Sequence, residues 1–92
     1  MKEKQQARYI VVLRPAARRD LDRLSDTAAQ RILQELAKLE ENPRPRGCKK
    51  LLGRPSAWRL RVGVYRVLYE ADDKAKLVRI FRVRHRKEVY RP

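Results

Sequence analysis

Alternating apolar and polar residues in the C-terminal half are the strongest structural pattern of this chain. The two alternating segments are Trp58-Arg59-Leu60-Arg61-Val62 and, after Gly63, Tyr65-Arg66-Val67-Leu68-Tyr69. Because successive side chains on a strand point to opposite faces, this spacing predicts two strands with one apolar and one cationic face. Gly63 predicts the reversal between them.

The N-terminal half predicts one strand and two helices. The β-branched run 9–13 predicts a buried strand, and Pro15 fits the first turn of a helix whose apolar residues follow at i, i+4 and i+7. A second helix is predicted from about 28 to 41, with Thr27 and Gln30 as a capping box. Its expected apolar stripe is Ala29, Ile32, Leu33, Leu36 and Leu39.

Prolines and glycines predict a loop over 43–57, with Leu51 and Leu52 packed on the core. Three antiparallel strands should follow, at about 57–62, 64–71 and 76–84. The order β-α-α-β-β-β predicts an α+β fold, in which an N-terminal strand and a helical hairpin pack on a small, mainly antiparallel four-stranded sheet. With 92 residues we expect one domain, 1–92, with residues 1–8 as a frayed start.

Charge is concentrated in the second half. The chain has 25 basic and 11 acidic residues, a formal net charge of +14. Residues 1–43 carry a net of +2 (nine basic, seven acidic) and residues 44–92 a net of +12 (sixteen basic, four acidic). The helices therefore resemble a scaffold with solvated faces, to which Asp20, Asp22, Glu35 and Glu40 are assigned, and the C-terminal strands resemble a surface for a polyanion.

Several functional classes are disfavoured by composition. One cysteine, Cys48, and one histidine, His85, cannot form an ordinary zinc site or an intrachain disulfide, and no cofactor is expected. No apolar run approaches the ~18 residues of a membrane span, and the first residues lack the apolar core of a signal peptide. We expect a cytoplasmic protein that has no membrane partner.

Arginine is the residue best suited to the expected ligand, because its guanidinium is always charged and fits phosphate with a planar fork of donors. In RNA cleavage by 2′-hydroxyl attack, fixed cations would stabilise the charge that gathers on the phosphoryl oxygens. Arg61, Arg66 and either Arg84 or Arg86 suit this task. Proton transfer needs other groups, and Tyr90 and His85 are the candidates, with Tyr90 preferred as the base.

The chain resembles the RelE/ParE toxin superfamily over residues 9–91. The resemblance is carried by the two alternating segments and by the ending Val83-Arg84-His85-Arg86-Lys87-Glu88-Val89-Tyr90. This ending is more similar to the RelE branch, which implies a ribosome-dependent endoribonuclease that cuts mRNA in the A site and is neutralised by a cognate acidic RelB-like antitoxin. The ParE branch instead implies inhibition of DNA gyrase.

The resemblance also implies roles for single residues. Arg59 and Arg61 fall on the RNA-facing strand, where some members carry lysines, and Arg66 falls on the arginine of the next strand. Tyr90 matches the C-terminal tyrosine that some members use in cleavage. Other basic residues expected to bind RNA are Lys49, Lys50, Arg54 and Lys87.

Two alternatives remain open from the sequence. The arginine face could be an ordinary solvated sheet face, with Tyr90 and His85 serving only structure. The chain could also be an RNA-binding module without catalysis. Transcript cleavage in cells would separate the endoribonuclease from the gyrase inhibitor and from the binding module.

Overall fold

The structure is a computed structural model that describes residues 8–89. Its elements are β1 (Ile10–Leu13), α1 (Pro15–Asp22), α2 (Asp26–Lys38), β2 (Lys49–Lys50), β3 (Ala57–Val62), β4 (Tyr65–Asp72), β5 (Leu77–His85) and α3 (Arg86–Val89). The predicted α+β order is confirmed, and the three C-terminal strands lie within one residue of their expected ranges at each end.

The sheet has the strand order β1-β5-β4-β3-β2, in which β1 is parallel to β5 and the other neighbours are antiparallel. The prediction of four strands is wrong in one detail, because the sheet has a fifth strand, the short edge strand β2. Lys49 and Lys50 pair with Arg59 and Trp58, inside the segment expected to be loop. A two-residue strand has no periodicity, so the sequence pattern could not indicate it.

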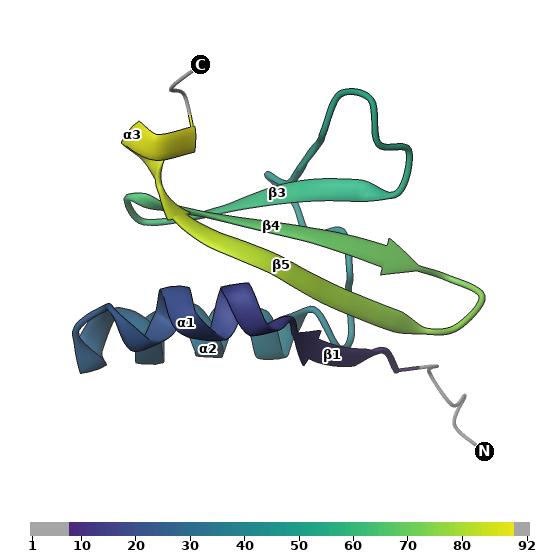
Figure 1. Ribbon diagram of the computed structural model, residues 1–92. Coiled ribbons are helices and arrows are strands. Elements are labelled where there is room, and N and C mark those ends of the chain that lie inside the picture. Colours follow the sequence, from purple (N-terminus) through teal and green to yellow (C-terminus); the bar gives the residue numbers. More distant parts are fainter. Residues whose placement is uncertain (1–7, 90–92) are drawn as a thin grey trace.

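Figure 1 shows α1 and α2 together on one face of the sheet, with α3 and the loop between β2 and β3 rising on the other side. The core lies between the two helices and the sheet. Its fully buried side chains include Ile32, Leu39, Val67, Tyr69 and Ile80. The apolar face predicted for the alternating segments is therefore the face that packs on the helices.

The second helix begins earlier and ends earlier than predicted. Ser25, not Thr27, is its N-cap, and the Ser25 hydroxyl accepts a hydrogen bond from the Ala28 N–H at 3.2 Å. Ser25 and Thr27 both have capping oxygens, so composition alone could not choose between them. Leu33, expected in the apolar stripe, is 44% exposed.

Two further expectations of burial are wrong. Ile10 is 65% exposed because β1 is an edge strand with only one face against the helices. Leu52 is 98% exposed, since it lies at the turn of the loop between β2 and β3 and not on the core.

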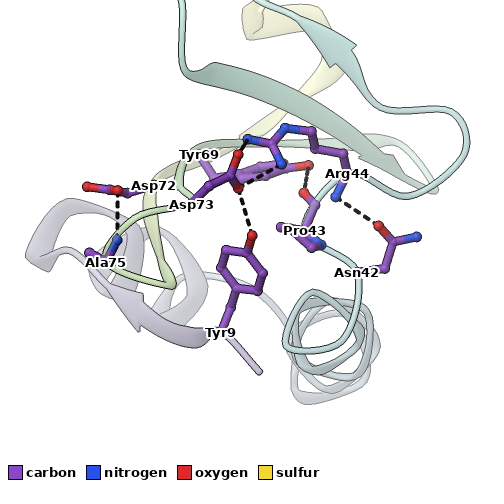
Figure 2. A network of polar contacts seen from close by, with 8 residues as sticks. All are labelled: Tyr9, Asn42, Pro43, Arg44, Tyr69, Asp72, Asp73 and Ala75. Atoms are coloured by element: carbon purple, nitrogen blue, oxygen red, sulfur yellow. Dashed lines mark hydrogen bonds and ion pairs between the residues drawn. The ribbon is translucent and has the colours of Figure 1, made fainter. Parts of the chain in front are cut away.

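A polar network fastens the loop after α2 to the turn between β4 and β5 (Figure 2). Both Asp73 carboxylate oxygens accept from the Arg44 guanidinium at 3.0 and 3.1 Å, and the Tyr9 hydroxyl donates to Asp73 Oδ1 at 2.7 Å. These bonds, from Arg44 first and then Tyr9, hold the pKa of Asp73 below its ordinary value. Beside them, the buried Tyr69 hydroxyl donates to the Pro43 carbonyl at 2.7 Å, and burial raises the pKa of Tyr69.

Replacing Tyr69 with phenylalanine should lower the free energy of unfolding by about 1–2 kcal/mol, because it leaves the Pro43 carbonyl without its buried donor. Chemical denaturation would measure the loss. Tyr9→Phe is the matched control: it removes a hydroxyl from an exposed hydrogen bond and should cost less. Equal losses for the two variants would contradict this ranking.

Candidate functional site

Three arginines form a row across the sheet, on the face away from α1 and α2. Arg66 of β4 pairs directly with Arg61 of β3 on one side and with Arg84 of β5 on the other. Directly opposed residues have β-carbons about 4.5–5.5 Å apart. We call Arg61, Arg66 and Arg84 the arginine row.

A pocket of about 370 Å³ opens at one end of this row. It is lined by Arg46, Gly47, Lys49, Arg59, Leu60, Arg61 and Arg66, and we call it the arginine pocket. Its lining side chains are basic or apolar, and none is acidic. Arg66 is only 7% exposed, whereas Arg61 is open to solvent. Because like charges facing each other across a sheet are destabilising, the pocket is arranged to gain from an anion.

The arginine pocket contains one basic residue, Arg46, that was not among the predicted site residues. It stands in the loop before β2, where Gly47 adopts a φ of +94° that favours glycine. Gly47, directly after Arg46 and close to two prolines, is a signal in the sequence for a turn at this position. The pairing of β2 with β3, which brings this loop to the strand face, was not predicted.

Arg82 lies in β5 between the core residues Ile80 and Val83. Its guanidinium is held by the carboxylate of Asp20 from α1. Asp20 accepts hydrogen bonds from Arg82 at 2.9 and 3.0 Å and from the Val83 N–H at 2.8 Å. Burial acts to raise the Asp20 pKa, but these bonds and the charges of Arg82 and Arg84 outweigh it and leave the pKa lowered. Asp20 is 8% exposed, so its assignment to a solvated helix face is wrong.

Glu70 of β4 lies at the other end of the cationic face. Glu70 accepts from Ser56 at 2.9 Å and from Arg79 at 3.0 Å. Its neighbours Tyr69 and Ala71 are buried in the core, so Glu70 points to the same face as Arg66. This face of the sheet is therefore cationic at the arginine row, whereas at Glu70 the positive charge of Arg79 is paired with a carboxylate.

His85, at the end of β5, lies on the opposite face of the sheet from the arginine row. It pairs with Tyr65, the residue before Arg66, and shares a hollow with Asp20 of α1. Its ring stands edge-on to Tyr65, with ring centroids 5.8 Å apart and planes at 79°. Its Nδ1 accepts the Lys87 backbone N–H at 3.2 Å, so the neutral imidazole carries its proton on Nε2. The strand register therefore does not bring His85 to the arginine row.

The remaining candidates lie around the row. Arg86 and Lys87 are in α3, which is held to the turn between β3 and β4 by the Arg86 N–H bond to the Val64 carbonyl at 2.7 Å. Lys50 and Arg54 line a separate hollow in the loop between β2 and β3. Tyr90 lies outside the described residues. The predicted site is thus partly assembled. Lys49, Arg59, Arg61 and Arg66 share the arginine pocket, and Arg84 adjoins it opposite Arg66, whereas His85 lies on the other face of the sheet.

Residues 8–89 contain no group of three or more histidine, cysteine or acidic side chains placed to hold a metal ion. No helix within this range has the length and apolar character needed to cross a membrane.

Comparison with known proteins identifies the family. Residues 11–90 match the model of the ParE toxin of the type II toxin–antitoxin system parDE. No curated protein matches.

Three solved structures illustrate the similarity. The RelBE2 toxin–antitoxin complex of Mycobacterium tuberculosis has a chain 33% identical, with a TM-score of 0.76, over 86% of this chain and 99% of that one. The RelE–RelB complex of Pyrococcus horikoshii has one 30% identical, with a TM-score of 0.76, over 85% and 94%. The isolated RelE toxin of Escherichia coli is 26% identical, with a TM-score of 0.73, over 89% and 90%.

The likeness thus extends over strands, helices and the arginine-bearing sheet. This chain belongs to the RelE/ParE superfamily of toxins of type II toxin–antitoxin systems, and its structure is of the RelE-like branch.

Proposed function

We propose that this toxin is a ribosome-dependent endoribonuclease that cuts mRNA in the A site by attack of a 2′-hydroxyl on the adjacent phosphate. The observation that carries the proposal is the arginine row, with Arg66 buried between Arg61 and Arg84. Burial of a permanently charged side chain in such a row has a free-energy cost, and binding of a phosphate offsets it.

In this mechanism the row binds the scissile phosphate. Negative charge grows on the phosphoryl oxygens as the 2′-hydroxyl attacks, and cations already fixed in place stabilise it without reorganising. Arg66, the most buried of the three, makes the central contact. Arg61 and Arg84 approach the same phosphate from the neighbouring strands, and Arg86 is the outer candidate from α3.

Proton transfer needs groups other than the arginines. Tyr90, close to arginines in the sequence, is the proposed base for the 2′-hydroxyl. His85, the second candidate, has its ring against Tyr65 on the opposite face of the sheet, so we assign no proton transfer to it. The leaving 5′-oxygen then takes its proton from water.

The surrounding cations would hold the RNA on the ribosome. Lys49 and Arg59 extend the arginine pocket, and Lys50, Arg54 and Lys87 lie on either side of it. Contacts of this kind give affinity that falls steeply with salt.

An acidic, RelB-like antitoxin is the proposed partner. A domain with a formal net charge of +14 and an open cationic pocket favours an acidic segment that wraps it. Solved structures of RelE-type toxins from three organisms are complexes with their RelB-type antitoxins, which supports the same kind of partner here. Coexpression with a small acidic protein encoded beside it should raise the yield and mask toxicity.

Inhibition of DNA gyrase is the second candidate, because the family model that matches this chain is that of ParE. It uses the same fold and would not need the arginine row for catalysis. The two functions differ in their targets: an endoribonuclease cuts mRNA, whereas a gyrase inhibitor causes damage to DNA.

Mapping mRNA ends in cells shortly after induction tests the proposal. Endoribonuclease action predicts new 5′ ends in phase with codons. Intact transcripts with a DNA-damage response would favour the gyrase inhibitor. Intact transcripts without that response, and with salt-sensitive RNA binding, would favour the non-catalytic module.

A further inference from the structure

The loop between β2 and β3 places a cation–aromatic pair on the same side of the sheet as the arginine row. The Arg54 guanidinium carbon lies 4.9 Å from the centre of the Phe81 ring. The two residues are 27 positions apart, so this contact lays the loop across the sheet. In Figure 1 the loop rises on the side away from α1 and α2.

Phe81 lies at an irregularity in β5. Leu68 pairs with Arg82 and the next residue, Tyr69, pairs with Ile80, so Phe81 is the extra residue of a bulge. Ile80 and Val83 on either side are core residues. Phe81 follows the core residue Ile80 and faces the opposite side of the sheet, where its large aromatic ring reaches the loop residue Arg54.

The pair lies about one nucleotide from the arginine row. Leu68 is two residues from Arg66 on the same face, about 7 Å along β4, and the bulge with Phe81 adjoins Leu68. An extended RNA strand whose phosphate sits at the row can therefore place a neighbouring base over the loop.

We propose that Arg54, supported by Phe81, is a stacking platform for the base adjacent to the nucleotide bound at the arginine row. A guanidinium lying on an aromatic ring keeps its outer plane for a second partner, and bases stack on such planes and on aromatic rings. The inference rests on the proposed function, since it assumes RNA as the ligand. It adds a base contact to a site otherwise made of phosphate contacts.

The contact between Arg54 and Phe81 would exist equally if it served only to fasten the loop. Arg54→Lys separates the two roles, because an ammonium keeps the charge over the ring but has no plane on which a base can stack. Phe81→Leu removes the support while keeping an apolar side chain. Lys50→Ala is the matched control, because it removes a cation from the same loop hollow without removing a planar group on which a base could stack.

The test uses ribosomes programmed with mRNAs in which one nucleotide beside the cleavage site is abasic. We measure cleavage at subsaturating toxin. The wild type and Lys50→Ala should each lose about tenfold in rate at one abasic position. Arg54→Lys should be about tenfold slower on intact mRNA and should show no further loss on the abasic one, and Phe81→Leu should behave similarly.

Full sensitivity of Arg54→Lys to the abasic position would overturn the platform while leaving the nuclease intact. If the wild type cuts no mRNA, the proposed function fails instead. The same abasic series is then read by equilibrium binding of short single-stranded RNA, where the same coupling supports the platform and its absence overturns it.

Discussion

Replacing Arg66 with alanine should slow cleavage of ribosome-bound mRNA by about 10²–10³-fold. Arg66 is the central and most buried member of the arginine row, so its guanidinium meets the developing charge with the least solvent screening. Single-turnover cleavage on programmed ribosomes measures the effect, and loss of growth inhibition in cells should accompany it.

Arg18→Ala is the control for this variant. It removes the same charge from the exposed surface of α1, on the other side of the sheet, and should cut at nearly the wild-type rate. Arg66→Ala must remain folded and must still bind antitoxin. A folded Arg66→Ala protein that cuts as fast as the Arg18 control would remove Arg66 from the mechanism.

Replacing Asp20 with alanine should lower the free energy of unfolding by about 2–3 kcal/mol. The substitution removes the acceptor of three hydrogen bonds and leaves the Val83 N–H and Arg82 without it. Arg82 is 40% exposed and can regain water, which keeps the loss below that of a fully buried pair. Denaturant unfolding at neutral pH measures it.

The contribution of Asp20 should also depend on pH in one direction. Its folded pKa is lowered, so its stabilisation is complete above the ordinary carboxyl pKa. As the pH falls below that value the unfolded state binds a proton first, and the stabilisation is lost as the pH passes through the folded pKa. Asp20→Ala should lose this acid-dependent part.

Asp22→Ala provides the comparison, since Asp22 is an exposed carboxylate two residues away on the same helix. It should change stability by less than about 0.5 kcal/mol. Equal losses at Asp20 and Asp22, or an unchanged acid dependence in Asp20→Ala, would contradict the role given to the carboxylate.

Much of the arginine row follows from local sequence. Alternation fixes which side chains share a face, and Gly63, with a φ of 61°, closes a two-residue turn that pairs Val62 with Tyr65. That register sets Arg61 opposite Arg66. Both signals act over a few residues, which is why they can be found without coordinates.

What the sequence did not reveal depends on contacts between distant segments. Asp20 and Arg82 are 62 residues apart, and nothing in the helix pattern distinguishes Asp20 from the exposed Asp22 beside it. The bulge at Phe81 interrupts an otherwise regular strand, so strict alternation from Val78 and Ile80 would turn Arg84 towards the helices in place of Val83. The choice between Arg84 and Arg86 likewise needed the register of β5, which puts Arg84 opposite Arg66 and leaves Arg86 to begin α3.

The most direct measurement uses purified toxin and ribosomes carrying an mRNA with a single 2′-deoxynucleotide at the mapped cleavage position. If the arginine row promotes attack by the 2′-hydroxyl, the all-ribose mRNA is cut and leaves a 2′,3′-cyclic phosphate, and the 2′-deoxy mRNA is not cut at that position. Cleavage at the 2′-deoxy position, or no cleavage of either mRNA by a folded toxin, would contradict the account.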